Sequence, residues 1–271
     1  MRQPGVAGFF YPKEPDVLNA TLDQFFLAPS LVDTSQIIRG IIAPHAGYMY
    51  SGQTAALAYQ TLRPFKYDSI ILLGPTHRMP LPLGSVLQEN AYLTPLGAIQ
   101  IDQSLANAIV LACPELGYIP DAFNQEHSLE VHLPFIQKTF QVVPPIVPIL
   151  VGAHSYESIQ KIAQAILNSI PQNQTCLVIA SSDLSHFYSA DVAEKIDRFS
   201  LAVIEENSIE KLGSELAAGK AEMCGFGPIL TLMMMMEAWG TFHSQVLGYT
   251  HSGNVTGDQS RVVGYGSVVY Y

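Results

Sequence analysis

The feature that most constrains the fold of this chain is the repeated alternation of short, wholly apolar segments with longer helix-like segments. Segments 69–74 (SIILLG) and 175–180 (TCLVIA) are almost continuously apolar, which is typical of strands buried on both faces of a parallel sheet. Strands that alternate with helices predict an α/β fold with a central, mostly parallel or mixed sheet flanked by helices. Because no linker rich in Pro, Gly or Ser divides the chain, we expect one domain over residues 1–271.

The expected elements follow from the lengths and composition of these segments. Strands are expected at 37–43, 69–74, 85–87, 99–101, 146–151, 175–180, 244–249 and 261–270. Helices are expected at 51–63, 103–113, 128–140, 155–170, 191–206, 208–218 and 227–239.

Composition and charge exclude several classes of protein. Only 13% of the residues are charged, against about 25% in an average globular chain, which argues against a disordered or coiled-coil protein. The formal net charge is −10 and no basic stripe is present, so we expect no nucleic-acid partner. The longest apolar stretch, at 225–239, is shorter than the ~20 residues that cross a bilayer. We therefore expect a buried helix there and no membrane partner.

The three cysteines, Cys113, Cys176 and Cys224, form no C-x-x-C pair and are odd in number. This pattern is neither a disulfide framework nor a zinc ribbon, and no apolar signal-peptide core lies near residue 1. A reducing cytoplasm is the expected compartment. Cys113 and Cys176 lie in apolar runs, so we expect them to fill the core. We expect the same of the run Met233–Met236.

Three of the expected buried strands run directly into a short loop that carries a histidine. These are His45, His77 and His186, and the loop before His186 also contains Asp183. In open α/β sheets, ligands bind beyond the carboxyl ends of the strands, where several loops converge. If the three strands are parallel neighbours, these four side chains face one cleft.

Imidazoles on fixed strand ends suit a transition metal, which needs two or three N, O or S ligands and an open position for chemistry. A further histidine could act as an acid or base, because its ordinary pKa lies near neutrality. The alternative is that each histidine only hydrogen-bonds the end of its strand. Repetition of the pattern in three loops favours a site.

Other candidate residues carry weaker signals. His127 stands at the expected start of a helix in E-H-S-L-E-V-H (126–132), which lacks the H-E-x-x-H spacing of zinc proteases. It could contact a substrate, support a ligand or only cap the helix. Cys224 precedes an apolar helix and could be a thiolate ligand, a nucleophile or a small buried residue. A serine hydrolase built on Ser182 and His186 is disfavoured, since no G-x-S-x-G elbow or oxyanion loop is recognisable.

Five ordered motifs resemble those of the Memo family. They are APHAGY at 43–48, GPTH at 74–77, EHSLEVHLP at 126–134, SSDLSH at 181–186 and CG at 224–225. The resemblance extends from RQPGVAGFFYP at 2–12 to VVGY at 262–265, which is nearly the whole chain. It implies a single α/β domain similar in fold to the class III extradiol dioxygenases, which open catechol rings with non-haem Fe(II) held by two His and one Glu.

The resemblance also implies roles for individual residues. His45 and His77 match the two histidine ligands, His186 matches the catalytic histidine, and His127 matches a histidine that lines the substrate pocket. The third ligand position carries Cys224, where the dioxygenases have a glutamate.

Two further expectations concern carboxylates near these positions. Asp183 is expected to share proton transfer with His186. Glu222 lies two residues from Cys224, and two such residues on a helix point about 200° apart, so only one should reach the cleft. The family match selects Cys224.

Two functions follow as expectations. The first is a metal-dependent dioxygenase or other oxidoreductase acting on a small molecule, with Fe(II) as the metal expected first and Cu or Zn as alternatives. The second is a non-catalytic module that holds an anionic or aromatic ligand, small molecule or peptide, in a vestigial cleft. Tyr48, Tyr50 and Arg78 would suit such a ligand, and the family includes an animal member linked to receptor-tyrosine-kinase signalling.

Overall fold

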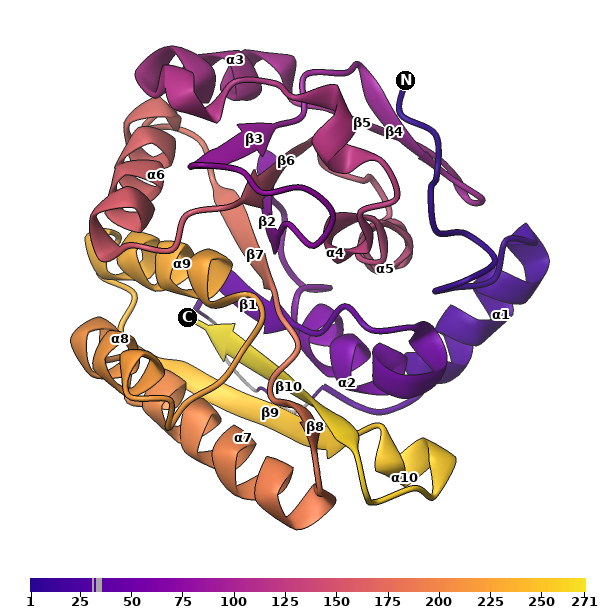
Figure 1. The fold of residues 1–271 in the computed structure, drawn as a ribbon. Helices are drawn as coiled ribbons and strands as arrows, with labels where there is room; N and C mark the ends of the chain where they lie inside the picture. Colours follow the sequence, from indigo (N-terminus) through magenta and orange to yellow (C-terminus); the bar gives the residue numbers. More distant parts are fainter. Residues whose placement is uncertain (31, 33–35) are drawn as a thin grey trace.

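The computed structural model describes residues 1–30, 32 and 36–271. These residues form an eight-stranded mixed sheet with helices on both faces (Figure 1). The order of the strands is β3 (Gly84–Val86), β6 (Ile146–Val151), β2 (Ser69–Pro75), β7 (Cys176–Ser181), β1 (Gly40–Ala43), β10 (Val262–Tyr270) and β8 (His186–Tyr188), and β9 (Ser244–His251) also pairs with β10. Strands β4 (Ala91–Thr94) and β5 (Gly97–Gln100) form a separate antiparallel pair. The predicted α/β fold with a mixed central sheet is confirmed.

Strands β6, β2, β7 and β1 run parallel to one another at the centre of the sheet. In their register, Ala43 of β1 lies opposite Ser181 of β7, and Leu73 of β2 lies opposite Ala180 of β7. The carboxyl ends of β1, β2 and β7 therefore meet at the same edge of the sheet, and the loops that follow them start side by side.

The strands bury side chains on both faces, because successive residues of a strand point in opposite directions. Ile42 and Ile71 pack into one core and Ile41 and Ile70 into the other. The first core is covered by α3 (Gln103–Ala112), α6 (Tyr156–Ser169), α7 (Ala190–Glu205), α8 (Ile209–Ala217) and α9 (Phe226–Ala238). The second is covered by α1 (Pro15–Phe25), α2 (Tyr48–Thr61), α4 (His127–Glu130) and α5 (Leu133–Thr139).

One predicted helix is divided in the structure. The segment predicted as a helix at 128–140 forms α4 and α5, and α5 begins with Pro134 in its first turn. Proline cannot donate the backbone hydrogen bond of a helix interior, and its ring collides with the carbonyl group four residues earlier, so it favours a new helix start. Helices α1 and α10 (Gly253–Thr256) and strands β4 and β8 were not among the elements expected from the sequence.

The predictions for the core residues are confirmed. Cys113 and Cys176 are buried, and the Met233–Met236 run is buried within α9. Nearly all of α9 is inside the protein, as expected for the apolar stretch at 225–239. No helix in the described part of the chain has the length and apolar character needed to cross a bilayer.

A buried carboxylate, Glu130, attaches the N-terminal segment to the rest of the fold. Its two oxygens accept hydrogen bonds from Gly5 N (2.7 Å), Val6 N (2.9 Å), Tyr11 Oη (2.8 Å) and Tyr92 Oη (3.2 Å). The segment held in this way carries Phe10, whose ring stacks on His127 with centroids 4.4 Å apart. Glu130 therefore helps to place Phe10 against His127, a member of the histidine cluster described below.

We predict that Glu130→Gln lowers the free energy of unfolding by about 1–3 kcal/mol, because an amide group cannot accept from all of these buried donors. Urea unfolding of the two proteins would measure the difference. A matched control is Glu194→Gln, which removes an exposed pair with Arg198 and should cost at most about 1 kcal/mol. Equal stability of the Glu130→Gln variant and the parent would contradict the anchoring role.

Candidate metal centre

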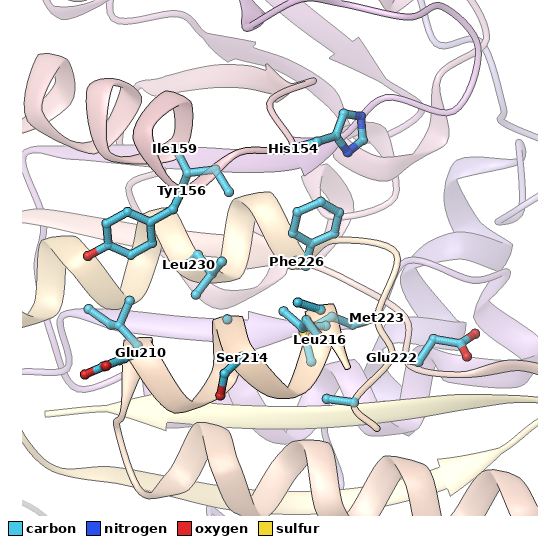
Figure 2. A pocket seen from close by; sticks show the side chains of 14 residues that line it. His154, Tyr156, Ile159, Glu210, Ser214, Leu216, Glu222, Met223, Phe226 and Leu230 are labelled. Atoms are coloured by element: carbon cyan, nitrogen blue, oxygen red, sulfur yellow. The ribbon is translucent and has the colours of Figure 1, made fainter. Parts of the chain in front are cut away.

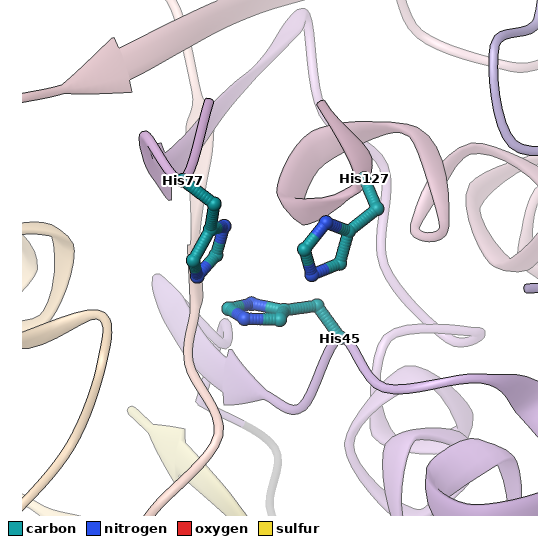
Figure 3. A group of neighbouring side chains, drawn as sticks. All are labelled: His45, His77 and His127. Carbon is teal, nitrogen blue, oxygen red and sulfur yellow. The ribbon is translucent and has the colours of Figure 1, made fainter. Parts of the chain in front are cut away.

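The loops after β1, β2 and β7 bring the predicted histidines to one edge of the sheet. His45 lies two residues beyond β1, His77 two residues beyond β2, and Asp183 two residues beyond β7. The order β2-β7-β1 confirms that the three strands are parallel neighbours. Figure 3 shows the imidazole rings of His45, His77 and His127 facing one another in this region.

The three imidazoles form a compact cluster that could hold a metal ion. One potential ligand nitrogen from each ring lies within 4.8 Å of the other two. The ring centroids are 5.1 Å apart for His45 and His77, 5.2 Å for His45 and His127, and 4.6 Å for His77 and His127. Nitrogens that share a tetrahedral ion at 2.0–2.1 Å are about 3.4 Å apart, which is compatible with the 4.8 Å limit that these three nitrogens satisfy.

His127 reaches the cluster because α4 packs closely against the end of β2. A Cβ atom at Gly74 of β2 would lie 2.7 Å from Leu129 Cδ2 and 2.8 Å from Ser128 Oγ. A side chain at residue 74 would have to displace those of Leu129 and Ser128, so glycine favours the close approach of α4.

His77 is held by a buried carboxylate from the start of α4. Glu126 Oε2 accepts from the backbone N–H of His77 at 2.5 Å, and Oε1 lies 3.0 Å from His77 Nδ1 and accepts from Ser128 N at 3.0 Å. Burial alone would raise the pKa of Glu126, but the hydrogen bonds from His77 and Ser128 outweigh it and lower the pKa to about 2. An ionised carboxylate only accepts hydrogen bonds, so His77 Nδ1 donates to it, and in the neutral imidazole the lone pair is therefore on Nε2.

His45 is held in the same way by a hydroxyl group. Ser181 Oγ donates its single hydrogen to the carbonyl oxygen of Ser128 at 2.6 Å. It also lies 2.6 Å from His45 Nδ1 and 2.9 Å from His132 Nε2, so both of these nitrogens must donate to it. His132 Nδ1 then accepts from Tyr59 Oη at 2.9 Å. This buried chain leaves Nε2 of His45 as an unprotonated acceptor.

His127 differs from the other two histidines of the cluster. Its Nδ1 atom is buried without a hydrogen-bond partner, and its nearest carboxylate oxygen, Glu126 Oε1, is 3.5 Å away. Its ring is stacked between Phe10 and His77. Burial lowers its pKa to about 4, and burial together with the neighbouring imidazoles lowers the pKa of His45 well below the ordinary value. Both rings are therefore neutral at pH 7, the form that binds metal ions.

Cys224 contacts the cluster through His45. Its Sγ atom lies 3.2 Å from His45 Nε2 and accepts from Asp183 N at 3.3 Å, and Cys224 N donates to the Asp183 carbonyl oxygen at 3.2 Å. Gly225 makes the approach possible, because a Cβ atom there would overlap the carbonyl oxygen of Ser181. Burial, followed by the charge of Asp183, raises the pKa of the Cys224 thiol.

Glu222 does not share this orientation, although it is only two residues from Cys224. Its Oε1 atom accepts from the backbone N–H of His186 at 3.1 Å. Of the two side chains, it is thus Cys224 that contacts His45.

Asp183 and His186 complete the polar lining of the edge. Asp183 Oδ1 accepts from His45 N at 2.8 Å, and Oδ2 lies 4.0 Å from His45 Nε2. Burial raises the pKa of Asp183 to about 7, against the opposing effect of hydrogen bonds from the backbone of His45 and Ala46. His186 is near enough to contribute to the lowered pKa of His45, and burial lowers its own pKa. It starts β8 opposite an irregularity in β10, and Phe187 after it has φ of 68°, a strained value for an aromatic residue.

The structure brings His45, His77 and His127 together, with Cys224 and Asp183 in contact with His45, and it adds partners that sequence reasoning missed. Glu126 could have been found as the residue just before a helix start. Ser181 and His132 stand inside motifs that the sequence analysis recognised, but nothing in the sequence indicates that they pair. Tyr59 lies outside those motifs. Tyr48 is buried and donates to the carbonyl oxygen of Val131, so it does not face a ligand.

Comparison with known proteins gives one consistent family. The sequence model of the family described as "Memo-like protein" matches residues 2–269. The chain is 35% identical over 281 residues to a MEMO1 family protein of Methanobrevibacter smithii, covering 100% of this chain and 99% of the relative. It is 36% identical over 276 residues to one of Methanothermobacter thermautotrophicus, with 98% of both chains covered. A MEMO1 family protein of Methanosarcina barkeri is 34% identical over 273 residues, with 99% of both chains covered.

We predict that Ser181→Ala weakens binding of Co²⁺ by about 10- to 100-fold, the usual effect of removing the group that orients a histidine ligand. The cause is loss of the acceptor that holds the His45 proton on Nδ1. Competition against a chelator would measure the affinity. Tyr59→Phe is the matched control, because it alters the far end of the same chain and leaves the Ser181–His45 contact in place. Unchanged Co²⁺ affinity in Ser181→Ala would contradict the role of Ser181 in orienting His45 as a metal ligand.

Proposed function

The chain belongs to the Memo-like protein family, and on this premise we propose that it is a metal-dependent oxidoreductase with His45, His77 and Cys224 as the metal ligands. One observation carries the proposal: His45 and His77 each have Nδ1 fixed by an oxygen atom, which leaves both Nε2 atoms as lone-pair donors. Ligating histidines in proteins are held in this way by carboxylates or other acceptors. His127 lacks such a partner.

The residues present fit a transition metal of the kind that non-haem oxygenases use. Two imidazoles and one anionic ligand, with further positions open, form the donor set of Fe(II) oxygen chemistry. Cys224 would supply the anion as a thiolate, which favours Fe(II), Cu or Zn over a hard ion such as Mg²⁺. A bound Fe(II) would supply one-electron chemistry towards O₂ or another oxidant.

The remaining polar residues are proposed to bind substrate and to move protons. Asp183, with a pKa of about 7, can both donate and accept a proton near neutral pH. His186 lies in the same lining with its backbone held by Glu222. The faces of the His127 ring are covered by Phe10 and His77, so His127 is proposed to contact a substrate through the edge of its ring. These groups give one cleft a ligand set and separate acid–base residues.

A second candidate function is a binding module for an anionic or aromatic ligand. The observation that favours it is Arg78, which is exposed beside His77 and whose charge contributes to the lowered pKa of His127. A guanidinium group at the mouth of the cleft suits a carboxylate or phosphate. Metal-free protein that binds such an anion, together with no O₂ uptake by metal-loaded protein, would favour this function over the oxidoreductase.

We predict that His45→Ala and His77→Ala each weaken Co²⁺ or Fe²⁺ binding by at least about tenfold, since loss of a direct ligand should exceed the loss of its supporting partner. Metal titration by calorimetry would measure this. His243→Ala removes an exposed histidine outside the cluster and is the control. Parent-like affinity in both cluster variants would exclude a metal centre at this edge.

Proton release identifies the third ligand. At pH 8, above the ordinary pKa of imidazole, histidine ligands release no proton, whereas a protonated Cys224 thiol must lose one. We predict about one proton per bound ion for the parent and for His127→Ala, and none for Cys224→Ala. A pH indicator in weakly buffered solution would count the protons. If the parent releases no proton and His127→Ala no longer binds the metal, the ligands are instead His45, His77 and His127.

A further inference from the structure

A large cavity opens between α6, α8 and α9, beside the candidate metal centre (Figure 2). Its volume is about 870 Å³, which is within the range of small-molecule binding sites. Residues from the first turn of α6 and the first turns of α9 form part of its wall, as Tyr156 and Phe226 show. Helix α6 follows β6, and α9 begins where Gly225 lies against Ser181 at the end of β7, so the cavity lies at the edge where ligands of α/β proteins bind.

Two segments of the chain line the cavity and also run close to the metal centre. Glu222 and Met223 line the cavity, and the next residue, Cys224, contacts His45. His154 lines the cavity and also a smaller hollow that His77 lines. The wall of the cavity is therefore continuous along the chain with residues of the candidate metal centre.

The lining defines what the cavity can hold. Its middle is apolar and includes Met223, Phe226 and Leu230. Figure 2 shows Glu210 towards one end and Glu222 towards the other. No Lys or Arg occurs among the described residues that line it. Apolar walls favour burial of hydrocarbon, and the two carboxylates disfavour an anion by charge repulsion and by the cost of burying an unpaired charge.

We propose that this cavity binds the apolar part of the substrate, a small hydrophobic molecule without negative charge, and that the reactive end of the molecule reaches the histidine cluster. The proposal rests on the proposed function, because it assigns the substrate class of the same centre. Arg78 lines the smaller hollow and does not line the cavity, so the cavity itself offers an anion no cationic partner among the described residues.

Gly213 offers a direct way to fill the cavity. It lies within α8 and lines the cavity, and a Cβ atom built on it would meet nothing within 4 Å. A side chain can therefore start from this position without its Cβ atom displacing a neighbour. Replacement of a helical glycine also favours the helix, by up to about 1 kcal/mol. Gly213→Phe should fold and occupy the site, and Ala217→Phe, from the same helix, is a second blocking variant.

The experiment uses three probes with the same eight-carbon chain: octyltrimethylammonium, 1-octanol and octanoate. Calorimetry with the metal-loaded full chain should show binding of the first two, with octanoate at least about tenfold weaker than octyltrimethylammonium. Gly213→Phe should weaken octyltrimethylammonium binding by at least about tenfold, because the volume is filled. Ala202→Phe, on an exposed position of α7, is the matched control and should bind like the parent. Thermal unfolding would check that each variant folds.

A spectroscopic readout tests the connection to the metal. In Co²⁺-loaded parent protein, octyltrimethylammonium should change the visible absorption of the ion, and in Gly213→Phe it should not. Preference for octanoate, or unchanged probe affinity in both blocking variants, would overturn the proposal. Binding of the probe without a change in the Co²⁺ spectrum would overturn the link between cavity and centre. If Co²⁺ does not bind but the probe does, the metal centre of the proposed function fails and the cavity is retained as a hydrophobic site.

Discussion

Parallel pairing of β1, β7 and β2 is the constraint on which the candidate centre depends. Adjacent parallel strands are about 4.8 Å apart, so loops that leave their carboxyl ends start within the reach of a single ion or small molecule. The backbone hydrogen bonds of three buried strands thus set the positions of His45 and His77, and side-chain packing only adjusts them. Antiparallel pairing of any of these strands would place one of the loops at the far edge of the sheet.

Hydrogen bonds at the Nδ1 atoms distinguish the three histidines of the cluster from one another. A histidine whose Nδ1 donates to an oxygen presents Nε2 as an electron-pair donor in a fixed direction, as His45 does through Ser181 and His77 through Glu126. His127 is held by ring stacking, which fixes its plane but leaves Nδ1 without a partner. Proximity alone therefore groups three histidines, whereas the hydrogen bonds select two of them as the better ligands.

The segment from Ala221 to Gly225 connects the two parts of the proposed site. Cys224 faces His45, while Glu222 faces the backbone of His186 and the cavity. Gly225 is what allows this segment to lie against the end of β7. A short segment that crosses the edge of the sheet thus supplies a candidate ligand on one side and a wall of the cavity on the other. A molecule bound in the cavity would contact the residue next to that ligand.

The sequence alone predicted the fold class and much of the site, because both depend on local patterns. Continuous apolar runs predict doubly buried strands, and histidines just after them predict a cluster at the carboxyl edge. The break between α4 and α5 was also encoded locally, in Pro134, but was not predicted.

The sequence could not supply the pairings among Ser181, His132 and Tyr59, or the direction of Cys224. These contacts join residues 49 to 179 positions apart, so only the packing of the sheet against its helices decides them. The cavity between α6, α8 and α9 has the same origin, since it is a space left between helices rather than a property of any one segment.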